Sequence, residues 1–177
     1  MKKKMISAIV ICIMCMATSI AQTSKEIDPS KVESLDAILA SLYDVVSGEK
    51  SKERNWELLK YLCQDDAKLI FYAPDDNGKK AITYLTIDGY VNMVGDYFSK
   101  NDFFEKEIHR TVDTFGPITQ VFSTYESYNS ETNKVPFARG INSIQLLNDG
   151  ERWWIVNVYW TSESETNPIP KRFLPKS

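Results

Sequence analysis

The chain has 177 residues, of which 43% are hydrophobic and 25% are charged, and its 21 Lys and Arg residues are outnumbered by 24 Asp and Glu residues. This length suits one domain built around one core. Acidic residues are in excess, and no basic cluster occurs after the first few positions. Nucleic acid and anionic membrane surfaces are therefore poor candidate partners.

The N-terminal residues have the pattern of a signal peptide. Three lysines precede the apolar run Met5–Ile20, which is too short for a stable membrane span, and small residues stand at Ser19 and Ala21, where a signal peptidase reads the chain. We predict that residues 1–21 are removed and that the protein is exported, to the periplasm or to the outside of the cell. An uncleaved membrane anchor is the alternative. After cleavage Cys63 is the only cysteine, so we expect no intramolecular disulfide.

The mature chain divides into three parts. We expect a flexible N-terminus over residues 22–33, one folded domain over residues 34–161, and an irregular tail over residues 162–177, where three prolines interrupt regular structure.

Apolar residues at three- and four-residue spacing predict three helices in the first half of the domain. The first follows a capping box formed by Ser30 and Glu33 and ends near Gly48. The other two cover about 56–63 and 87–98.

Strands are predicted where the pattern changes to alternation. Two short strands, at 68–72 and 81–85, bracket a turn between the second and third helices. Four long strands follow, at about 104–115, 117–128, 136–147 and 151–161. Helices followed by an antiparallel meander indicate the α+β class, in which the sheet wraps around the helices to bury its apolar face.

Four stretches carry a resemblance to a known superfamily: DAKLIFY, HRTVDTFGPITQVFSTYES, RGINSIQLLNDGERWWIVNVYW and NPIP. Over roughly residues 34–174 the chain resembles the exported members of the nuclear transport factor 2-like superfamily, which includes the SnoaL-like polyketide cyclases and the ketosteroid isomerases. The resemblance implies a cone-shaped α+β fold, with three N-terminal helices on a curved, mostly antiparallel sheet around a pocket, and frequently a dimer through the sheet's outer face. The catalytic Asp and Tyr of the isomerases match no position here, so no catalytic residue is carried over.

Two turns predict which side chains share a face of the sheet. A two-residue hairpin at Asp149 and Gly150 pairs Asn148 with Glu151 and continues down both strands. This register places the following residues on one face: Asn142, Trp153, Ile155, Asn157 and Tyr159. It places a second apolar set on the opposite face: Trp154, Val156, Val158 and Trp160.

A symmetrical turn at Gly116 pairs Arg110 with Ser123 and Ile108 with Tyr125 on the inner face. The opposite face of the same strand then carries polar residues, among them Glu105, Glu107 and His109. We expect that face to contact water.

The inner face therefore combines polar and apolar groups. Its predicted site residues are Arg110, Ser123, Tyr125, Asn142, Trp153, Asn157 and Tyr159, with Ile155 as further apolar wall. Each polar group buried without a partner would cost about 1–3 kcal/mol, so these groups either bond one another in a polar core or line a pocket that takes a small-molecule ligand. Because Arg110 would be the only cation there, the pattern favours an anionic ligand.

In a monomer, the apolar face on the other side of the last two strands would be exposed to water. We predict a homodimer through Trp154, Val156, Val158 and Trp160, with the C-terminal tail folded over these residues as the alternative.

The sequence contains no zinc-ligand spacing, glycine-rich phosphate loop or nucleophile elbow, so we expect no metal and no cofactor. The only histidine, His109, is assigned to the polar face and is expected to be dispensable. The leading hypothesis is an exported, non-catalytic small-molecule-binding domain. The alternatives are a protein-interaction module, or an isomerase- or dehydratase-like enzyme that uses an aspartate with Tyr125 or Tyr159. A carboxylate oxygen within hydrogen-bond reach of a pocket tyrosine would favour the enzyme.

Overall fold

The computed structural model describes residues 27–74 and 77–176. The predicted signal peptide lies outside the described residues, so its cleavage stays a prediction. No helix within the described ranges is long and apolar enough to cross a membrane.

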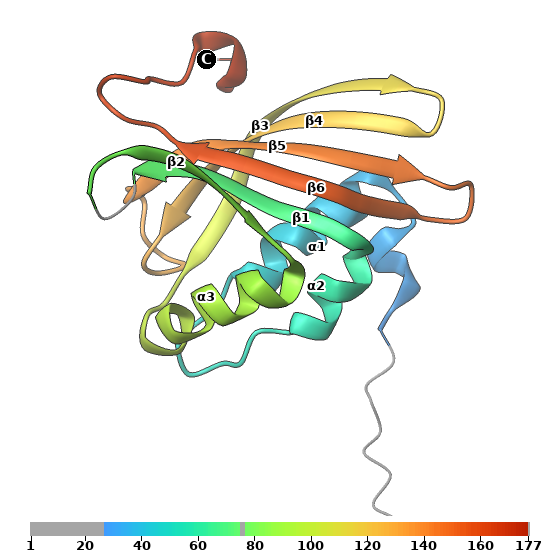
Figure 1. The fold of residues 1–177 in the computed structure, drawn as a ribbon, viewed down its shortest axis with the longest axis horizontal. Coiled ribbons are helices and arrows are strands. Elements are labelled where there is room, and N and C mark those ends of the chain that lie inside the picture. The colour runs from blue at the N-terminus through green and yellow to red at the C-terminus, as the bar shows by residue number, and fades with distance from the viewer. Residues whose placement is uncertain (1–26, 75–76, 177) are drawn as a thin grey trace, which may run out of the picture.

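Three α-helices and a preceding 3-10 helix form one layer of the molecule (Figure 1). They are η1 (Pro29–Val32), α1 (Leu35–Val46), α2 (Trp56–Leu62) and α3 (Ile87–Lys100). A polar side chain caps the N-terminus of each α-helix and accepts a hydrogen bond from a backbone N–H of the first turn: Ser34, Asn55 and Thr86. The cap of the first helix is therefore Ser34 rather than the predicted Ser30. Val32 is buried in the core, which begins before the expected domain boundary at residue 34.

Six strands form one curved sheet against these helices (Figure 1). They are β1 (Cys63–Pro74), β2 (Lys80–Leu85), β3 (Phe104–Phe115), β4 (Ile118–Tyr128), β5 (Ala138–Asn148) and β6 (Trp153–Ser162). The spatial order is β2-β1-β6-β5-β4-β3, and each neighbouring pair is antiparallel except β1 with β6. The predicted α+β class and curved, mostly antiparallel sheet are confirmed.

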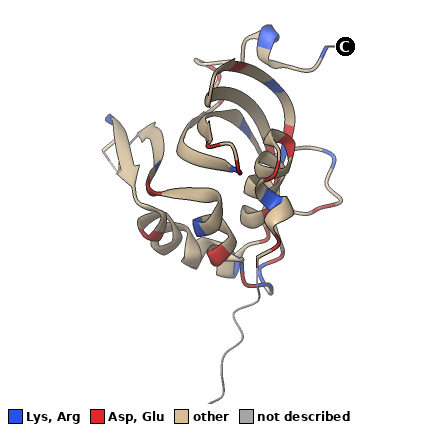
Figure 2. Cartoon of the chain, turned by 90° about the vertical axis from the view of Figure 1, so that its right-hand side faces the viewer, with Lys and Arg blue, Asp and Glu red and all other residues tan. Residues whose placement is uncertain are grey.

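The core fills the space between the helices and the inner face of the sheet. Its fully buried side chains come from both layers and include Ile38, Leu39, Leu59, Leu62, Ile144 and Ile155. Complete burial of one such side chain stabilises the fold by about 1.5–3 kcal/mol. The sheet bends around this core, and acidic and basic positions are interspersed along the ribbon (Figure 2).

A bulge in β3 corrects the predicted inner face. Arg110 pairs with Ser123 as expected, but Glu107 rather than Ile108 lies opposite Tyr125, because the register shifts by one residue at Ile108. One extra residue in a strand reverses the alternation of side chains beyond it. Glu105 and Glu107 therefore turn toward the helices, and their predicted position on the water-facing side is wrong.

A longer turn and a second bulge correct the β5–β6 register. Asn148 pairs with Trp153 around a four-residue loop, so the predicted two-residue turn and its pairing with Glu151 are wrong. The side chain of Asp149 accepts hydrogen bonds from the backbone N–H groups of Glu151 and Arg152 within this loop.

The bulge in β6 lies at Val156, between the pairs Leu146–Ile155 and Gln145–Asn157. Beyond it the faces exchange: Val158 and Trp160 pack toward the helices, whereas Asn157 and Tyr159 lie on the outer face. Trp154, Val156, Val158 and Trp160 therefore do not share one outer surface.

The C-terminal tail crosses the outer face of β3 and β4, on the opposite side of the sheet from the helices (Figure 1). The Thr124 hydroxyl donates to the carbonyl of Phe173, and the rings of Phe122 and Phe173 lie 5.4 Å apart. The tail thus covers the β3–β4 surface, which corrects both the expectation that this surface faces water and the alternative that the tail covers the β6 tryptophans.

Candidate functional site

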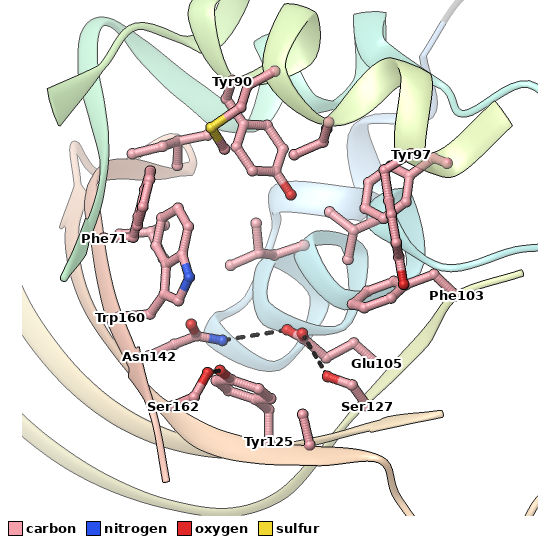
Figure 3. Close-up of a pocket in the computed structure, with 18 of the residues that line it drawn as sticks. Phe71, Tyr90, Tyr97, Phe103, Glu105, Tyr125, Ser127, Asn142, Trp160 and Ser162 are labelled. Atoms are coloured by element: carbon pink, nitrogen blue, oxygen red, sulfur yellow. Dashed lines mark hydrogen bonds between the residues drawn. The ribbon is translucent and has the colours of Figure 1, made fainter. Parts of the chain in front are cut away.

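A cavity of about 360 Å³ lies between α3 and the inner face of the sheet (Figure 3). This volume falls within the roughly 300–1,000 Å³ typical of small-molecule pockets. Its wall is rich in aromatic rings from α3 and four strands or their flanks: Phe71, Tyr90, Tyr97, Phe103, Tyr125 and Trp160. Trp160 reaches this wall only because the β6 bulge turns it inward.

Glu105 is the only acidic or basic residue among the described residues that line the cavity. The side-chain amide of Asn142 donates to its Oε1 at 3.4 Å, and the Ser127 hydroxyl donates to its Oε2 at 3.3 Å (Figure 3). Burial raises the pKa of the Glu105 carboxyl to about 7, and these two long hydrogen bonds offset only part of that rise. Glu105 can therefore hold or release a proton near neutral pH.

A chain of buried hydrogen bonds fixes the orientation of Asn142. Its Nδ2 also donates to the Tyr43 hydroxyl at 3.1 Å, and that hydroxyl lies 2.6 Å from Ser123 Oγ. Ser123 in turn donates its proton to Glu107, so Tyr43 must donate to Ser123. Burial raises the pKa of Tyr43, which keeps this hydroxyl protonated as a donor.

Arg110 completes this network outside the cavity. Its Nε lies 2.9 Å from Glu107 Oε2, and its Nη1 lies 2.7 Å from Asp36 Oδ1 near the start of α1. The prediction that Arg110 faces the pocket is wrong, because the β3 bulge brings Glu107 to the same side and Glu107 engages the guanidinium.

Tyr125 forms part of the cavity wall, and its hydroxyl lies 3.3 Å from Ser162 Oγ. Burial raises the pKa of Tyr125 to about 12. Gly140 lies opposite Tyr125 on β5, and a Cβ built at Gly140 would collide with the Tyr125 hydroxyl and the Thr161 carbonyl. The absence of a side chain at Gly140 therefore determines where the Tyr125 ring can lie.

The structure brings together only some of the predicted site residues. Tyr125 and Asn142 line the cavity, and Ser123 is fully buried in the hydrogen-bond chain behind it. Trp153 packs against the core. Asn157 and Tyr159 lie outside, where Asn157 donates to Gln145. Whether any of these residues contacts a ligand stays a prediction.

Sequence reasoning missed Glu105, Trp160 and the α3 aromatics as cavity residues. For Tyr90 and Tyr97 a signal existed, since both fall on the predicted apolar face of the third helix. For Glu105 and Trp160 the alternation pointed to the wrong side, because nothing in the pattern marks either bulge.

His109 lies on the outer side of β3, as the parity argument predicts, but not in open water. It pairs with Thr124, whose side chain bonds the C-terminal tail. Its Nε2 is buried and has no hydrogen-bond partner among the described residues. His109 is therefore remote from the cavity, and its dispensability stays a prediction.

This arrangement of helices packed on a curved six-stranded sheet, with a cavity between them, is the nuclear transport factor 2-like fold. Many solved structures share this fold, among them the following three. One is a nuclear transport factor 2-like protein of unknown function from Silicibacter pomeroyi (15% identity, 73% of this chain and 92% of that chain covered, TM-score 0.51). The second is the beta subunit of a Burkholderia mallei benzoate 1,2-dioxygenase (15% identity, 80% and 98% covered, TM-score 0.52).

The third is a Nostoc punctiforme protein of unknown function, described as having a cystatin-like fold (10% identity, 72% and 90% covered, TM-score 0.53). No protein-family model matches the sequence, and a comparison with curated proteins finds no match. At these sequence identities the structural similarity establishes the fold alone, and any function depends on the residues of the cavity.

Proposed function

We propose that this chain is an exported protein that binds one small, largely apolar molecule in the cavity between α3 and the sheet, without chemically changing it. The observation that carries the proposal is the cavity itself, about 360 Å³ of space walled by aromatic rings and a single charged group among the described lining residues. The export part rests on the signal-peptide pattern of residues 1–21.

The polar groups behind the cavity support a binding site rather than a reactive one. Tyr43, Ser123 and Asn142 bond one another and Glu107, so they hold the wall in one arrangement. The anionic ligand expected from the sequence loses its basis, because Arg110 is engaged by Asp36 and Glu107 outside the cavity.

A fluorescent probe tests the proposal. N-phenyl-1-naphthylamine, a neutral molecule that brightens in apolar surroundings, should bind the mature protein saturably at one site. Ala138→Phe projects a ring into the cavity and should weaken this binding at least about tenfold, since the probe loses the space it needs. Gln145→Phe, which adds the same ring to the outer face of the same strand, is the control and should bind normally. Absence of binding, or equal binding by both variants, contradicts the proposal.

One observation favours an enzyme as the second candidate. Glu105 has a pKa near 7 and shares the cavity with Tyr125, a combination suited to moving a proton on a bound substrate. Within the described residues, however, the hydrogen bonds of its carboxylate go to Asn142 and Ser127 rather than to a cavity tyrosine.

Isotope exchange separates binding from catalysis. Molecules that co-purify with the protein from its native source would be incubated in D₂O with the wild type and with Glu105→Gln. Deuterium that enters a carbon position only with the wild type, detected by mass spectrometry, supports the enzyme; an unchanged molecule with both supports pure binding.

We also propose that the protein forms a homodimer, through a surface different from the one expected from the sequence. Val158 and Trp160 lie in the core and the cavity wall, so they cannot form part of the dimer surface predicted from the sequence. The outer face of β2, β1 and β6 instead exposes a set of large apolar side chains: Tyr72, Ile82, Tyr84 and Tyr159.

A further inference from the structure

We propose that the ligand of this cavity is a hydrophobic amine bound as its protonated ammonium ion, with the nitrogen on the Glu105 carboxylate and the hydrocarbon body among the aromatic rings. This inference rests on the proposed binding function and adds the charge and chemical class of the ligand.

The first argument is the charge of the cavity. Its described lining contains no Lys, Arg or His, and no salt bridge within the described ranges involves Glu105. Glu107, two residues along the same strand, shows the contrast, because Arg110 neutralises it at 2.6 Å. An ionised carboxylate in an apolar wall is costly without a counter-ion, so a ligand that brings a cation gains more here than a neutral or anionic one.

The second argument is the direction of the hydrogen bonds at Glu105. The network anchored on Arg110 and Glu107 makes Tyr43 a donor to Ser123, so Tyr43 accepts from the Nδ2 of Asn142. The amide nitrogen of Asn142, not its oxygen, therefore faces Glu105, and Ser127 provides a second donor. Two donors aimed at the two carboxylate oxygens suit an ionised group that accepts a third hydrogen bond from an ammonium.

The third argument is the arrangement of the rings. Tyr90 reaches into the cavity from α3 and meets Trp160 at 6.2 Å with perpendicular planes, while Phe71 lies 5.6 Å from Trp160 (Figure 3). Glu105 lines the same cavity as these rings. Burial, and to a smaller extent the negative charge of Glu105, raises the pKa of Tyr90. Aromatic faces attract cations within about 6 Å and also accept hydrocarbon, so the same wall suits both parts of an amine.

Three compounds with the same indole ring test the charge preference: tryptamine is a cation, tryptophol is neutral and indole-3-acetate is an anion. Each would compete with N-phenyl-1-naphthylamine for the mature protein at pH 8. We expect tryptamine to bind at least about tenfold more tightly than tryptophol, as one charge-assisted hydrogen bond provides, and indole-3-acetate to bind most weakly.

Glu105→Gln keeps the size of the side chain and removes its charge. The tryptamine preference should then shrink to about twofold or less, while tryptophol binding is maintained. Asp113→Asn removes a charge from the exposed part of the same strand and should leave the preference intact.

The pH profile provides a second readout. Tyr43 on α1, Tyr90 on α3 and Tyr125 on β4 interact electrostatically with Glu105, and Glu107 lies two residues along β3 on the same side of the strand. The three tyrosines have raised pKa values and stay neutral below pH 9, so Glu105 dominates the profile. Tryptamine affinity should fall from pH 8 to pH 6 as Glu105 takes up a proton, and Glu105→Gln should remove this slope.

The outcomes separate the two proposals. If the fluorescent probe binds but tryptophol or indole-3-acetate competes as well as tryptamine, or if Glu105→Gln keeps the preference, the amine inference is wrong and the binding function stands. If neither the probe nor any of the three compounds binds the wild type, both are wrong.

Discussion

Glu105 and Glu107 are chemically identical side chains with opposite electrostatic surroundings. Glu107 is ion-paired with Arg110, whereas the Glu105 carboxyl lies in the cavity wall with its pKa raised to about 7 by burial. Environment rather than residue type therefore gives the two acids different roles, one as an anchor of the wall and one as a group that a ligand can engage.

The raised pKa of Glu105 makes the stability of the protein depend on pH. Its carboxyl titrates at about 7 when folded and near 4.5 when unfolded, so the folded state binds the proton more tightly and becomes less stable as pH rises through this window. At pH 8 the free energy of unfolding of Glu105→Gln should therefore exceed that of the wild type by up to about 3 kcal/mol, and its unfolding temperature should be higher. At pH 4 the two proteins should be equally stable. Thermal unfolding followed by circular dichroism measures it. Equal pH dependence in both proteins would refute the assignment.

Gly140 controls the shape of the cavity through Tyr125. Gly140→Ala places a methyl group against the Tyr125 hydroxyl, which forces the ring to move and should weaken probe binding at least about tenfold. Gly95→Ala on α3 is the matched control, because a Cβ there meets no atom within 4 Å and alanine favours the helix. Fluorescence titration compares the two, and the idea fails if both variants bind like the wild type.

At the scale of elements, the loop between α1 and α2 positions part of the cavity wall. The buried guanidinium of Arg54 donates hydrogen bonds to four backbone carbonyls of α1 and this loop. It also lies over the ring of Phe98. Gly48 in the same loop exchanges two backbone hydrogen bonds with Phe103, a cavity residue. One buried cation thus ties the end of a helix to the start of β3.

Loss of Arg54 should consequently destabilise the whole domain. Arg54→Met removes the guanidinium donor from all four carbonyls, of which those of Gly48 and Glu49 keep one backbone N–H donor. We expect a loss of at least about 2 kcal/mol in free energy of unfolding. Lys52→Met, in the same loop but exposed, should change stability by no more than about 0.5 kcal/mol. Urea denaturation measures both. Similar midpoints for Arg54→Met and the wild type would show that water replaces the guanidinium without cost.

At the scale of the whole molecule, the outer face of the sheet has two halves. The C-terminal tail covers the β3–β4 half through Phe173 and Thr124. The described residues leave the half formed by β2, β1 and β6 uncovered, and Tyr84 there is 62% exposed. An apolar surface of this kind is expected to contact another molecule, and a second copy of the chain presents a matching one across a two-fold axis.

Sedimentation of the mature protein tests this assembly. The wild type should run as a dimer at tens of micromolar, and Tyr84→Lys should shift it toward monomer, since a charge is then buried without a partner. Phe115→Lys, at an exposed hairpin remote from the patch, should leave the dimer intact. A monomeric wild type, or a dimer unaffected by Tyr84→Lys, contradicts the assignment.

The sequence by itself determined the class and the order of elements, because helical spacing and alternation depend on which residues are apolar along short segments. The helix near residues 35–46 and the strands near 104–115 and 118–128 follow from such patterns. The general type of fold follows too, since helices and a meander with complementary apolar faces have few ways to pack.

Only the tertiary structure decided which side chains enter the cavity. One extra residue at Ile108 and one at Val156 reverse the alternation beyond each point, and either register leaves a plausible local pattern. The choice depends on contacts between distant segments: Glu107 meets Arg110 and Ser123 in one case, and Trp160 meets Phe71 and Tyr90 in the other. Such contacts form only after the helices pack on the sheet, so the order of apolar and polar residues along the sequence does not predict them.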